Sequence, residues 1–311
     1  MSNNLTYTKK NFYKESTPEA VAAAYDYCKG YADYLDNAKT EREAVSYSIA
    51  LAEANGYKPY TFGMEIKAGD KYYYNNRSRS LFLFRVGSED INNGMRIVAS
   101  HIDSPRLDFK QMPFYEDGGF CFAKTRYYGG VRKYQWVALP LALHGVIVKR
   151  DGEVVDVKIG DDETDPVFYI NDLLPHLAQE QSKKPLSSAI PAESLNILLG
   201  SRPVADNEDG NEIKMNVLSL INEKYGVEEE DFLSADIFVV PAGKARDVGF
   251  DRSLISAYGH DDKVCAYPSL TALFESDDSV HTIMVVLADK EEIGSEGNTD
   301  RKSTRLNSSH A

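Results

Sequence analysis

Three short segments of this sequence carry ionisable side chains in patterns that suit metal-dependent chemistry. The first segment reads His101-Ile102-Asp103-Ser104-Pro105. An imidazole is a common metal ligand, and a carboxylate two residues away can hold the other ring N–H and fix the tautomer. The alternative is a capping histidine and a turn-forming aspartate before proline. This segment alone therefore does not establish a metal site.

The second segment, Gly259-His260-Asp261-Asp262-Lys263, precedes an apolar stretch at residues 264–274 that is typical of a helix. Paired acids at a helix start usually cap free N–H groups and suit the helix dipole. A carboxylate also has two oxygens, so one aspartate at this position could bridge two cations. Taken alone, the segment favours the capping interpretation.

The third segment, Asp289-Lys290-Glu291-Glu292, follows directly on an apolar run. Charges at the end of a buried strand are costly unless a partner or a metal neutralises them. Neighbouring glutamates could provide one metal ligand and one free carboxylate. The free carboxylate could accept a proton from a water whose pKa is lowered by zinc. The alternative is a solvated acidic turn.

Other catalytic motifs are missing from the sequence. It contains no Gly-rich phosphate loop of either common pattern and no G-x-S-x-G motif. Serine hydrolases, kinases and dinucleotide-dependent enzymes need such motifs. These classes of enzyme therefore lack a site in this chain.

Two short apolar runs must position the first and third segments. Residues 96–100 and 282–288 are nearly continuous apolar runs rich in β-branched side chains. Such runs predict strands buried on both faces of a largely parallel sheet that is flanked by helices. In open α/β sheets, sites form beyond the carboxyl ends of the strands. We therefore expect an α/β fold with a mixed, largely parallel sheet and with both charged segments at one edge of that sheet.

Local signals predict further elements near the N-terminus. Thr17-Pro18-Glu19 is typical of a helix start, and Thr40-Glu41-Arg42-Glu43 fits a capping box that opens a second helix ending near Gly56. Residues 71–75 and 80–86 are typical of two strands, and the polar turn between them predicts a β-hairpin.

The middle of the chain has different local sequence signals from the two ends. Turn signals and short β runs fill residues 105–235, including a hairpin around Asp151-Gly152. We expect a β-rich domain inserted into an α/β domain, whose two parts are residues 1–104 and 236–299.

Residues 300–311 are polar and basic, unlike a helix that would cover the preceding strand. We expect them to be a non-native appendage on a truncated chain, and a disordered native tail is the alternative.

Composition limits the partners and the compartment. The sequence has 48 acidic and 35 basic residues, which gives a formal net charge of −13. Such acidity argues against nucleic acid or an anionic membrane as a partner. The 3 cysteines are far apart and form no CxxC pair, which is typical of reduced thiols. The N-terminus lacks a signal-peptide pattern and no run is long enough to span a membrane. We expect a cytoplasmic protein.

The ordered set HIDSP, GHDD and DKEEIGS resembles the aspartyl aminopeptidase family of co-catalytic zinc exopeptidases, and its bacterial branch in particular. The resemblance runs from the N-terminal helices to about Asn298 and includes the segments at residues 71–74, 128–130 and 241–247. It implies a zinc exopeptidase-like α/β fold with an inserted β-rich dimerisation domain. It also implies a hydrolase that removes N-terminal residues from peptides. The family suggests acidic N-terminal residues as substrates, and the residues of this sequence leave the specificity open.

The resemblance also implies roles for particular residues. His101 would bind one zinc ion, Glu292 would bind the other, and Asp261 would bridge both. Glu291 would be the general base that takes a proton from the bridging water and delivers it to the leaving amine. Asp103 would orient His101.

Family members assemble from dimers into hollow dodecamers, so the resemblance implies a homo-oligomer. His176 resembles a histidine that reaches a neighbouring subunit's active site from the dimerisation domain.

The sequence departs from the family pattern in one respect. The family has two further ligands downstream, an acidic residue and a histidine, and neither has a counterpart here. His310 lies in the unusual tail and is not assigned to that role. We therefore expect this chain to bind zinc weakly and to have little activity. The alternatives are a related zinc amidohydrolase or deacylase, and a non-catalytic fragment that serves as an interaction or assembly module.

Overall fold

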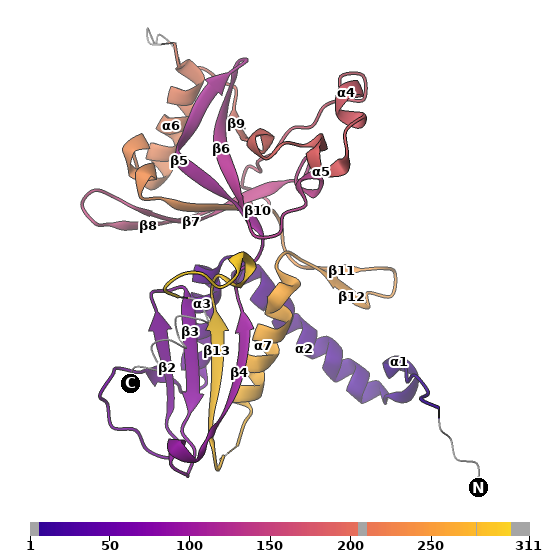
Figure 1. The fold of residues 1–311 in the computed structure, drawn as a ribbon, viewed down its shortest axis with the longest axis vertical. Helices are drawn as coiled ribbons and strands as arrows, with labels where there is room; N and C mark the ends of the chain where they lie inside the picture. Colours follow the sequence, from indigo (N-terminus) through magenta and orange to yellow (C-terminus); the bar gives the residue numbers. More distant parts are fainter. Residues whose placement is uncertain (1–5, 205–209, 278, 300–311) are drawn as a thin grey trace.

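The computed structural model describes residues 6–204, 210–277 and 279–299 of the chain, and they form two lobes (Figure 1). A five-stranded sheet with helices lies in the first lobe, and a six-stranded sheet lies in the second. The tail expected at residues 300–311 lies outside the described residues.

The helices of the first lobe begin where the sequence predicts. After a short helix α1 (Phe12–Glu15), helix α2 (Pro18–Asn37) starts behind the capping hydroxyl of Thr17. Helix α3 (Glu41–Ala54) has the predicted capping box, in which Thr40 and Glu43 satisfy each other's backbone N–H groups. Helix α3 packs on strands of the sheet and helix α2 packs on α3, through a common core of apolar side chains that includes Tyr34, Val45 and Leu83.

The first sheet is mixed, as expected, but it is not largely parallel, because two of its four strand pairs are antiparallel. Its strands, in spatial order, are β1 (Lys58–Pro59), β2 (Lys71–Asn76), β3 (Ser80–Arg85), β13 (Thr282–Ala288) and β4 (Met95–His101). β4 and β13 run parallel, as do β1 and β2, whereas β3 is antiparallel to both of its neighbours. The predicted hairpin β2–β3 is confirmed, and it introduces the antiparallel strand into the sheet.

One expectation about burial is wrong for β4. In β13, Val285 and Leu287 are buried, but in β4 the side chains of Ile97 and Val98 are 56% and 49% exposed. β4 pairs only with β13 among the described strands and lies at the edge of the sheet. An apolar run cannot distinguish a central strand from an edge strand, because both read the same along the sequence.

The second lobe is built on an antiparallel sheet. Its strands, in spatial order, are β8 (Val154–Ile159), β7 (Leu141–Val148), β10 (Asp236–Pro241), β5 (Arg106–Asp117), β6 (Phe120–Tyr128) and β9 (Ile197–Gly200). The predicted hairpin is present as β7–β8, with Val148 opposite Val154. β10 pairs with β7 and β5, so this sheet extends beyond residue 235, where the sequence placed the end of the inserted region.

The remaining elements surround these two sheets. They are α4 (Gln179–Ser182), α5 (Leu186–Ala189), α6 (Glu212–Tyr225), the hairpin β11 (Arg246–Val248) and β12 (Leu254–Ser256), and α7 (His260–Phe274). Short 3₁₀ turns complete the described chain, and the last of them, η5 (Glu291–Ile293), follows β13. None of the helices in the described parts of the chain has the length and apolarity needed to cross a membrane.

Buried charges connect the two lobes. Lys39, just before α3, has its ammonium 2.5 Å from Asp161 of the second lobe. His144 on β7 lies between two carboxylates, with Nδ1 2.7 Å from Glu43 and Nε2 3.0 Å from Asp161, the latter an ion-pair contact without hydrogen-bond geometry. Because these groups are largely shielded from water, each charge depends on its partner across the junction.

Candidate metal centre

The pairing of β4 with β13 determines where the charged segments meet. The two strands are parallel neighbours, and Ala288, at the end of β13, lies opposite His101, at the end of β4. Both carboxyl ends point toward the second lobe (Figure 1). The turn η5 follows β13 after two residues and places Glu291 and Glu292 above His101. The expected meeting of the two segments at one edge of the sheet therefore occurs.

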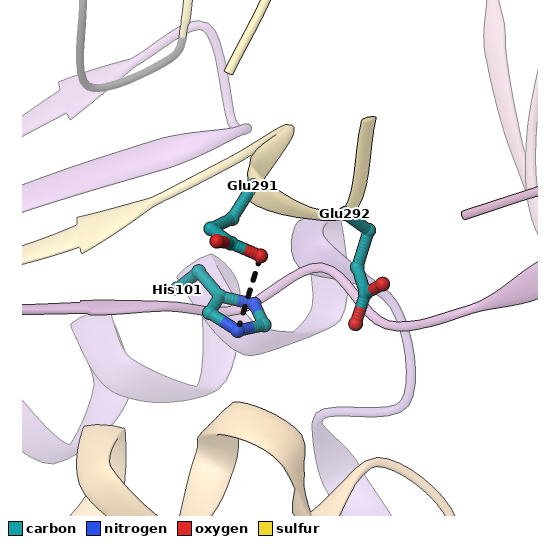
Figure 2. Close-up of side chains that lie close together, drawn as sticks. All are labelled: His101, Glu291 and Glu292. Carbon is teal, nitrogen blue, oxygen red and sulfur yellow. Dashed lines mark ion pairs between the residues drawn. The ribbon is translucent and has the colours of Figure 1, made fainter. Parts of the chain in front are cut away.

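The three side chains form a compact group of possible metal ligands. Among the described residues, His101, Glu291 and Glu292 each offer a ligand atom, and these atoms all lie within 4.8 Å of one another. His101 Nε2 is 3.7 Å from a carboxylate oxygen of Glu291, the contact dashed in Figure 2. His101 is buried, whereas 44% of the Glu291 side chain is exposed. The group is thus open to solvent on the glutamate side.

Asp261 lies next to this group but is not one of its three members. Its carboxylate Oδ1 is 3.1 Å from His101 Nε2, and its side chain is 82% exposed. It stands at the start of α7, where its backbone carbonyl accepts a hydrogen bond from Ser104 Oγ at 3.0 Å. The neighbouring Asp262 accepts a long hydrogen bond, 3.4 Å, from the backbone N–H of His101. The helix start thus faces the strand end from the opposite side of the histidine.

Asp103 is the buried hub of the site. Its backbone carbonyl accepts a hydrogen bond from His101 Nδ1 at 3.0 Å, which leaves Nε2 directed at the acidic side chains. Its carboxylate accepts the backbone N–H groups of Glu291 and Glu292, at 3.2 and 3.1 Å, and the hydroxyl of Tyr128 at 2.8 Å. One aspartate therefore contacts all three members of the group.

The electrostatics of the site depend on these contacts. Burial lowers the pKa of His101, but the hydrogen bonds and charge of Asp103 outweigh burial and raise that pKa to about 9. Burial raises the pKa of Asp103, yet His101, Tyr128 and the Glu292 amide together hold it below its usual value. Burial, with the nearby charges of Asp103, Asp261 and Glu291, raises the pKa of Glu292. A positive charge is thus favoured at the centre of the cluster.

Three further residues near the site were given no role from the sequence, although Tyr128 and Gly129 lie in the segment 128–130 that resembles the family and Lys263 ends the second charged segment. Tyr128 ends strand β6 of the second lobe. Lys263 is fully buried, and its ammonium donates to Ser104 Oγ at 2.9 Å. Gly129, with φ of +72°, lies so close to Glu292 that an added Cβ would be 3.0 Å from the Cβ of that glutamate. Only the folded chain brings these residues to the site.

A cavity opens beside Asp261. It has a volume of about 630 Å³ and is lined by Ser104, Pro105 and the start of α7 on one side. Arg132, Lys244 and Arg246 also line it, and Asp261 is the acidic residue among its described lining. A negatively charged group of a bound molecule would therefore find cationic partners within reach of the cluster.

His176 is not part of this constellation. It lies in a turn before α4, in the second lobe, and its side chain is exposed. The leucines around it, Leu174 and Leu177, are 67% and 70% exposed. The segment therefore projects from the lobe and takes no part in the group around His101 within the described chain.

The donor set fits a zinc ion. Zinc prefers imidazole nitrogen and carboxylate oxygen in a compact arrangement, and a ligating histidine usually donates its other ring N–H to a carbonyl or carboxylate. His101 has that arrangement, with Nδ1 held by the Asp103 carbonyl and Nε2 facing the acids.

Comparison with known proteins gives consistent matches along the chain. The family model "Aminopeptidase I zinc metalloprotease (M18)" matches residues 34–309. A probable M18 family aminopeptidase 1 of Clostridium acetobutylicum is 46% identical over 307 residues. The alignment covers 97% of this chain and 66% of that relative. This chain thus spans just under two thirds of that relative's length.

Solved structures match as closely. The crystal structure of an M18 family aminopeptidase from Thermotoga maritima superposes with a TM-score of 0.91 at 41% identity. That match covers 98% of this chain and 66% of the solved one. A structure described as the S. cerevisiae mApe1 dodecamer, at 21% identity and a TM-score of 0.70, covers 92% of this chain and 66% of its own, and shows a shared fold alone.

Proposed function

The chain belongs to the aminopeptidase I zinc metalloprotease (M18) family, and from that membership we propose that its site serves zinc-dependent removal of N-terminal residues from peptides. The observation that carries the proposal is the group His101, Glu291 and Glu292, whose ligand atoms lie within 4.8 Å of one another. The group lies beyond the carboxyl ends of β4 and β13, where sites of α/β sheets form. We also propose that the protein is cytoplasmic.

We assign the roles of the residues as follows. His101 would hold one zinc ion and Glu292 a second, and Asp261 would contribute its carboxylate to both. Asp261 Oδ1 already lies 3.1 Å from His101 Nε2, and its exposed side chain can turn toward either ion. Asp103 orients His101 through the contact of its carbonyl with Nδ1 at 3.0 Å.

Glu291 is the general base in this proposal. Zinc, when bound, supplies positive charge that polarises the scissile carbonyl and lowers the pKa of the attacking water. The Glu291 carboxylate is partly exposed and faces the site from η5. It accepts the proton of that water and then delivers it to the leaving amine, which completes hydrolysis of the first peptide bond.

The cavity beside Asp261 supports a preference for acidic N-terminal residues. Arg132, Lys244 and Arg246 line it, and a substrate carboxylate placed there would pair with guanidinium or ammonium groups. The acidic side chains next to the cavity, Asp261 in its lining and Glu291 and Glu292 near His101, suit the positively charged N-terminus of the peptide. Charge would thus orient the substrate with its first peptide bond near Glu291.

We further propose that the protein acts as a homo-oligomer, a dimer that builds a dodecamer. The exposed leucines at positions 173, 174 and 177 form an apolar surface on the projecting segment of the second lobe. Soluble proteins usually cover such surfaces with a partner. His176 lies within this surface, from which it would reach the site of a neighbouring copy.

Zinc binding and peptide hydrolysis test the proposal together. The 311-residue chain and a chimera that carries the Clostridium relative's residues after position 299 are loaded with zinc. They are then assayed on aspartyl, glutamyl and leucyl peptides. We expect bound zinc in both, with weaker binding and little turnover in the chain itself, because a catalytic zinc normally has three protein ligands. Comparable turnover of the two proteins would refute the expected shortage of ligands. A chimera without zinc-dependent turnover would refute the proposed function.

The donor count favours a second candidate, a chain without catalysis. Among the described residues the compact group has three members, which is too few for two fully ligated catalytic ions. A zinc deacylase is a third candidate, because it would use the same donor set.

This candidate has its own test. Release of acetate from N-acetyl amino acids, with no release of residues from free peptides, would distinguish a deacylase from an aminopeptidase.

A further inference from the structure

We propose that Tyr128 is a positioning residue through which the second lobe fixes the geometry of the metal-ligand group in the first lobe. The hydroxyl of Tyr128 donates to Asp103, which is not a proposed ligand. Tyr128 acts on the ligands through Asp103, whose carboxylate oxygen Oδ2 accepts both this hydroxyl and the backbone N–H of Glu292 in η5. The metal part of this inference rests on the proposed function, whereas the positioning part stands on contacts within the chain.

The hydroxyl of Tyr128 is well placed for this role. It donates to Asp103 Oδ2 at 2.8 Å, in a buried environment where Tyr128 is 9% and Asp103 0% exposed. Burial and the charge of Asp103 raise the pKa of Tyr128, so the hydroxyl remains protonated and can only donate to the carboxylate. A buried carboxylate without this donor would lose a charge-assisted hydrogen bond and would be free to turn.

The ring of Tyr128 is itself held in place. The guanidinium of Arg106 lies 3.9 Å from the centre of the Tyr128 ring and 3.8 Å from that of Phe238, so it is stacked between the two aromatic side chains. Arg106 is in turn paired with Glu41 at the start of α3. Tyr128 therefore has one orientation, fixed by strands β5, β6 and β10 of the second lobe and by a helix of the first.

The effect passes from Asp103 to the ligands by direct hydrogen bonds. The carboxylate that receives Tyr128 also receives the amides of Glu291 and Glu292, at 3.2 and 3.1 Å. The same residue holds His101 Nδ1 through its carbonyl. A change in the Asp103 carboxylate would therefore move the turn that carries both glutamates relative to the histidine. Partners of this kind usually change metal affinity by about 10- to 100-fold.

The test compares two buried tyrosines whose hydroxyls each donate to a carboxylate, that of Asp103 in the site and that of Glu53 away from it. Tyr128→Phe removes the hydroxyl and keeps the ring that stacks on Arg106. The control is Tyr73→Phe, because Tyr73 is 8% exposed and its hydroxyl donates to Glu53 at 2.7 Å, away from the site. Amide hydrogen exchange at Glu291 and Glu292 is measured by NMR in the zinc-free 311-residue chain. Zinc affinity is measured by competition with a chelating dye, and thermal unfolding of both variants is recorded.

We expect Tyr128→Phe to accelerate exchange of both amides about fivefold or more, because it loosens their acceptor, and to weaken zinc binding about 10-fold or more. Tyr73→Phe should lower thermal stability similarly and leave both site readouts within about twofold of the unmodified chain. Unchanged exchange in Tyr128→Phe would overturn the inference and reduce Tyr128 to a structural role. If the unmodified chain bound no zinc, the proposed function would fail, and amide exchange would still decide the role of Tyr128.

Discussion

The carboxylate of Glu41, at the first turn of helix α3, lies 3.2 Å from the guanidinium of Arg106, the first residue of strand β5. Both residues are buried, and Glu41 also pairs with Arg79 from the first lobe. Burial raises the pKa of Glu41, but Arg106 and Arg79 outweigh that effect and hold it below its usual value. A single carboxylate thus joins the two lobes next to the residues that hold Asp103.

Loss of this carboxylate should destabilise the chain strongly. Glu41→Ala removes a buried carboxylate shared by two arginines, which keep contacts with Asp108 and Asp236, and breaking a buried ion pair costs roughly 3–5 kcal/mol. Urea unfolding of the zinc-free chain measures the change. The control is Lys29→Ala, which breaks an ion pair with Asp26 whose side chains are 77% and 78% exposed. We expect no measurable change from the control, and an equally small effect of Glu41→Ala would contradict our account of the junction.

Replacement of the proposed base should separate zinc binding from catalysis. In the chimera with the Clostridium relative's C-terminal segment, Glu291→Gln keeps the shape of the side chain and removes the proton acceptor. We expect turnover to fall roughly 10²–10⁴-fold while the bound zinc, measured by atomic absorption, stays the same. Parallel loss of zinc and turnover would mean that Glu291 is a ligand and that the roles of Glu291 and Glu292 are reversed.

The two histidines singled out in the sequence should behave differently. His101→Ala removes a member of the ligand group, and zinc affinity of the 311-residue chain should fall by more than the roughly 10- to 100-fold typical of outer partners. His176→Ala should leave zinc affinity unchanged, because His176 lies in an exposed turn outside the group. A dye competition assay compares the two variants at one pH. Equal effects would remove His101 from the site.

Two adjacent glycines offer a steric test of the contact between the second lobe and Glu292. Gly129 has φ of +72°, and a Cβ there would lie 3.0 Å from Glu292 Cβ and 3.1 Å from its Oε2, whereas a Cβ on Gly130 would meet nothing within 4 Å. Gly129→Ala should displace Glu292 and weaken zinc binding about tenfold or more. Its left-handed backbone should also cost about 1–2 kcal/mol of stability. Gly130→Ala should change neither quantity. Matching effects of the two variants on zinc affinity would exclude a specific contact with Glu292.

The junction histidine should make stability depend on pH. Burial lowers the pKa of His144, but Asp161 and Glu43 outweigh burial and raise it above the ordinary value of 6.5. Lys39 and Lys158 are the cations that act on these two carboxylates. Protonated His144 therefore stabilises the folded state fully below pH 6.5, and this contribution disappears as the pH rises through the raised pKa.

Urea unfolding between pH 6 and pH 9 measures this contribution as the difference between the unmodified chain and His144→Gln. The unmodified chain should be the more stable at pH 6, and its advantage should shrink toward pH 9. The difference isolates His144 from other groups that titrate in the same range. An advantage that stays constant with pH would show that His144 does not carry a proton at the junction.

Local sequence patterns determined the elements and the positions of the chemistry. Thr17 and Thr40 cap helices where their side chains predict, because capping depends on groups only three residues apart. The apolar runs before His101 and before Asp289 form strands, and the charged residues follow at their ends. The ordered motifs also resembled the family to which the chain belongs. These features depend on short spacings, which a sequence displays directly.

The tertiary structure alone decided which strand lies at the edge of the sheet and which residues support the site. Asp103 and Tyr128 are 25 residues apart, and Glu41 and Arg106 are 65 apart. No periodicity of a helix or strand links positions at such separations. The apolar pattern of β4 predicted burial on both faces, but burial depends on neighbouring strands and helices rather than on the strand itself. The sequence had already pointed to Asp103 as the residue that orients His101, whereas its donor Tyr128 and the buried junction are evident only from the contacts between the two lobes.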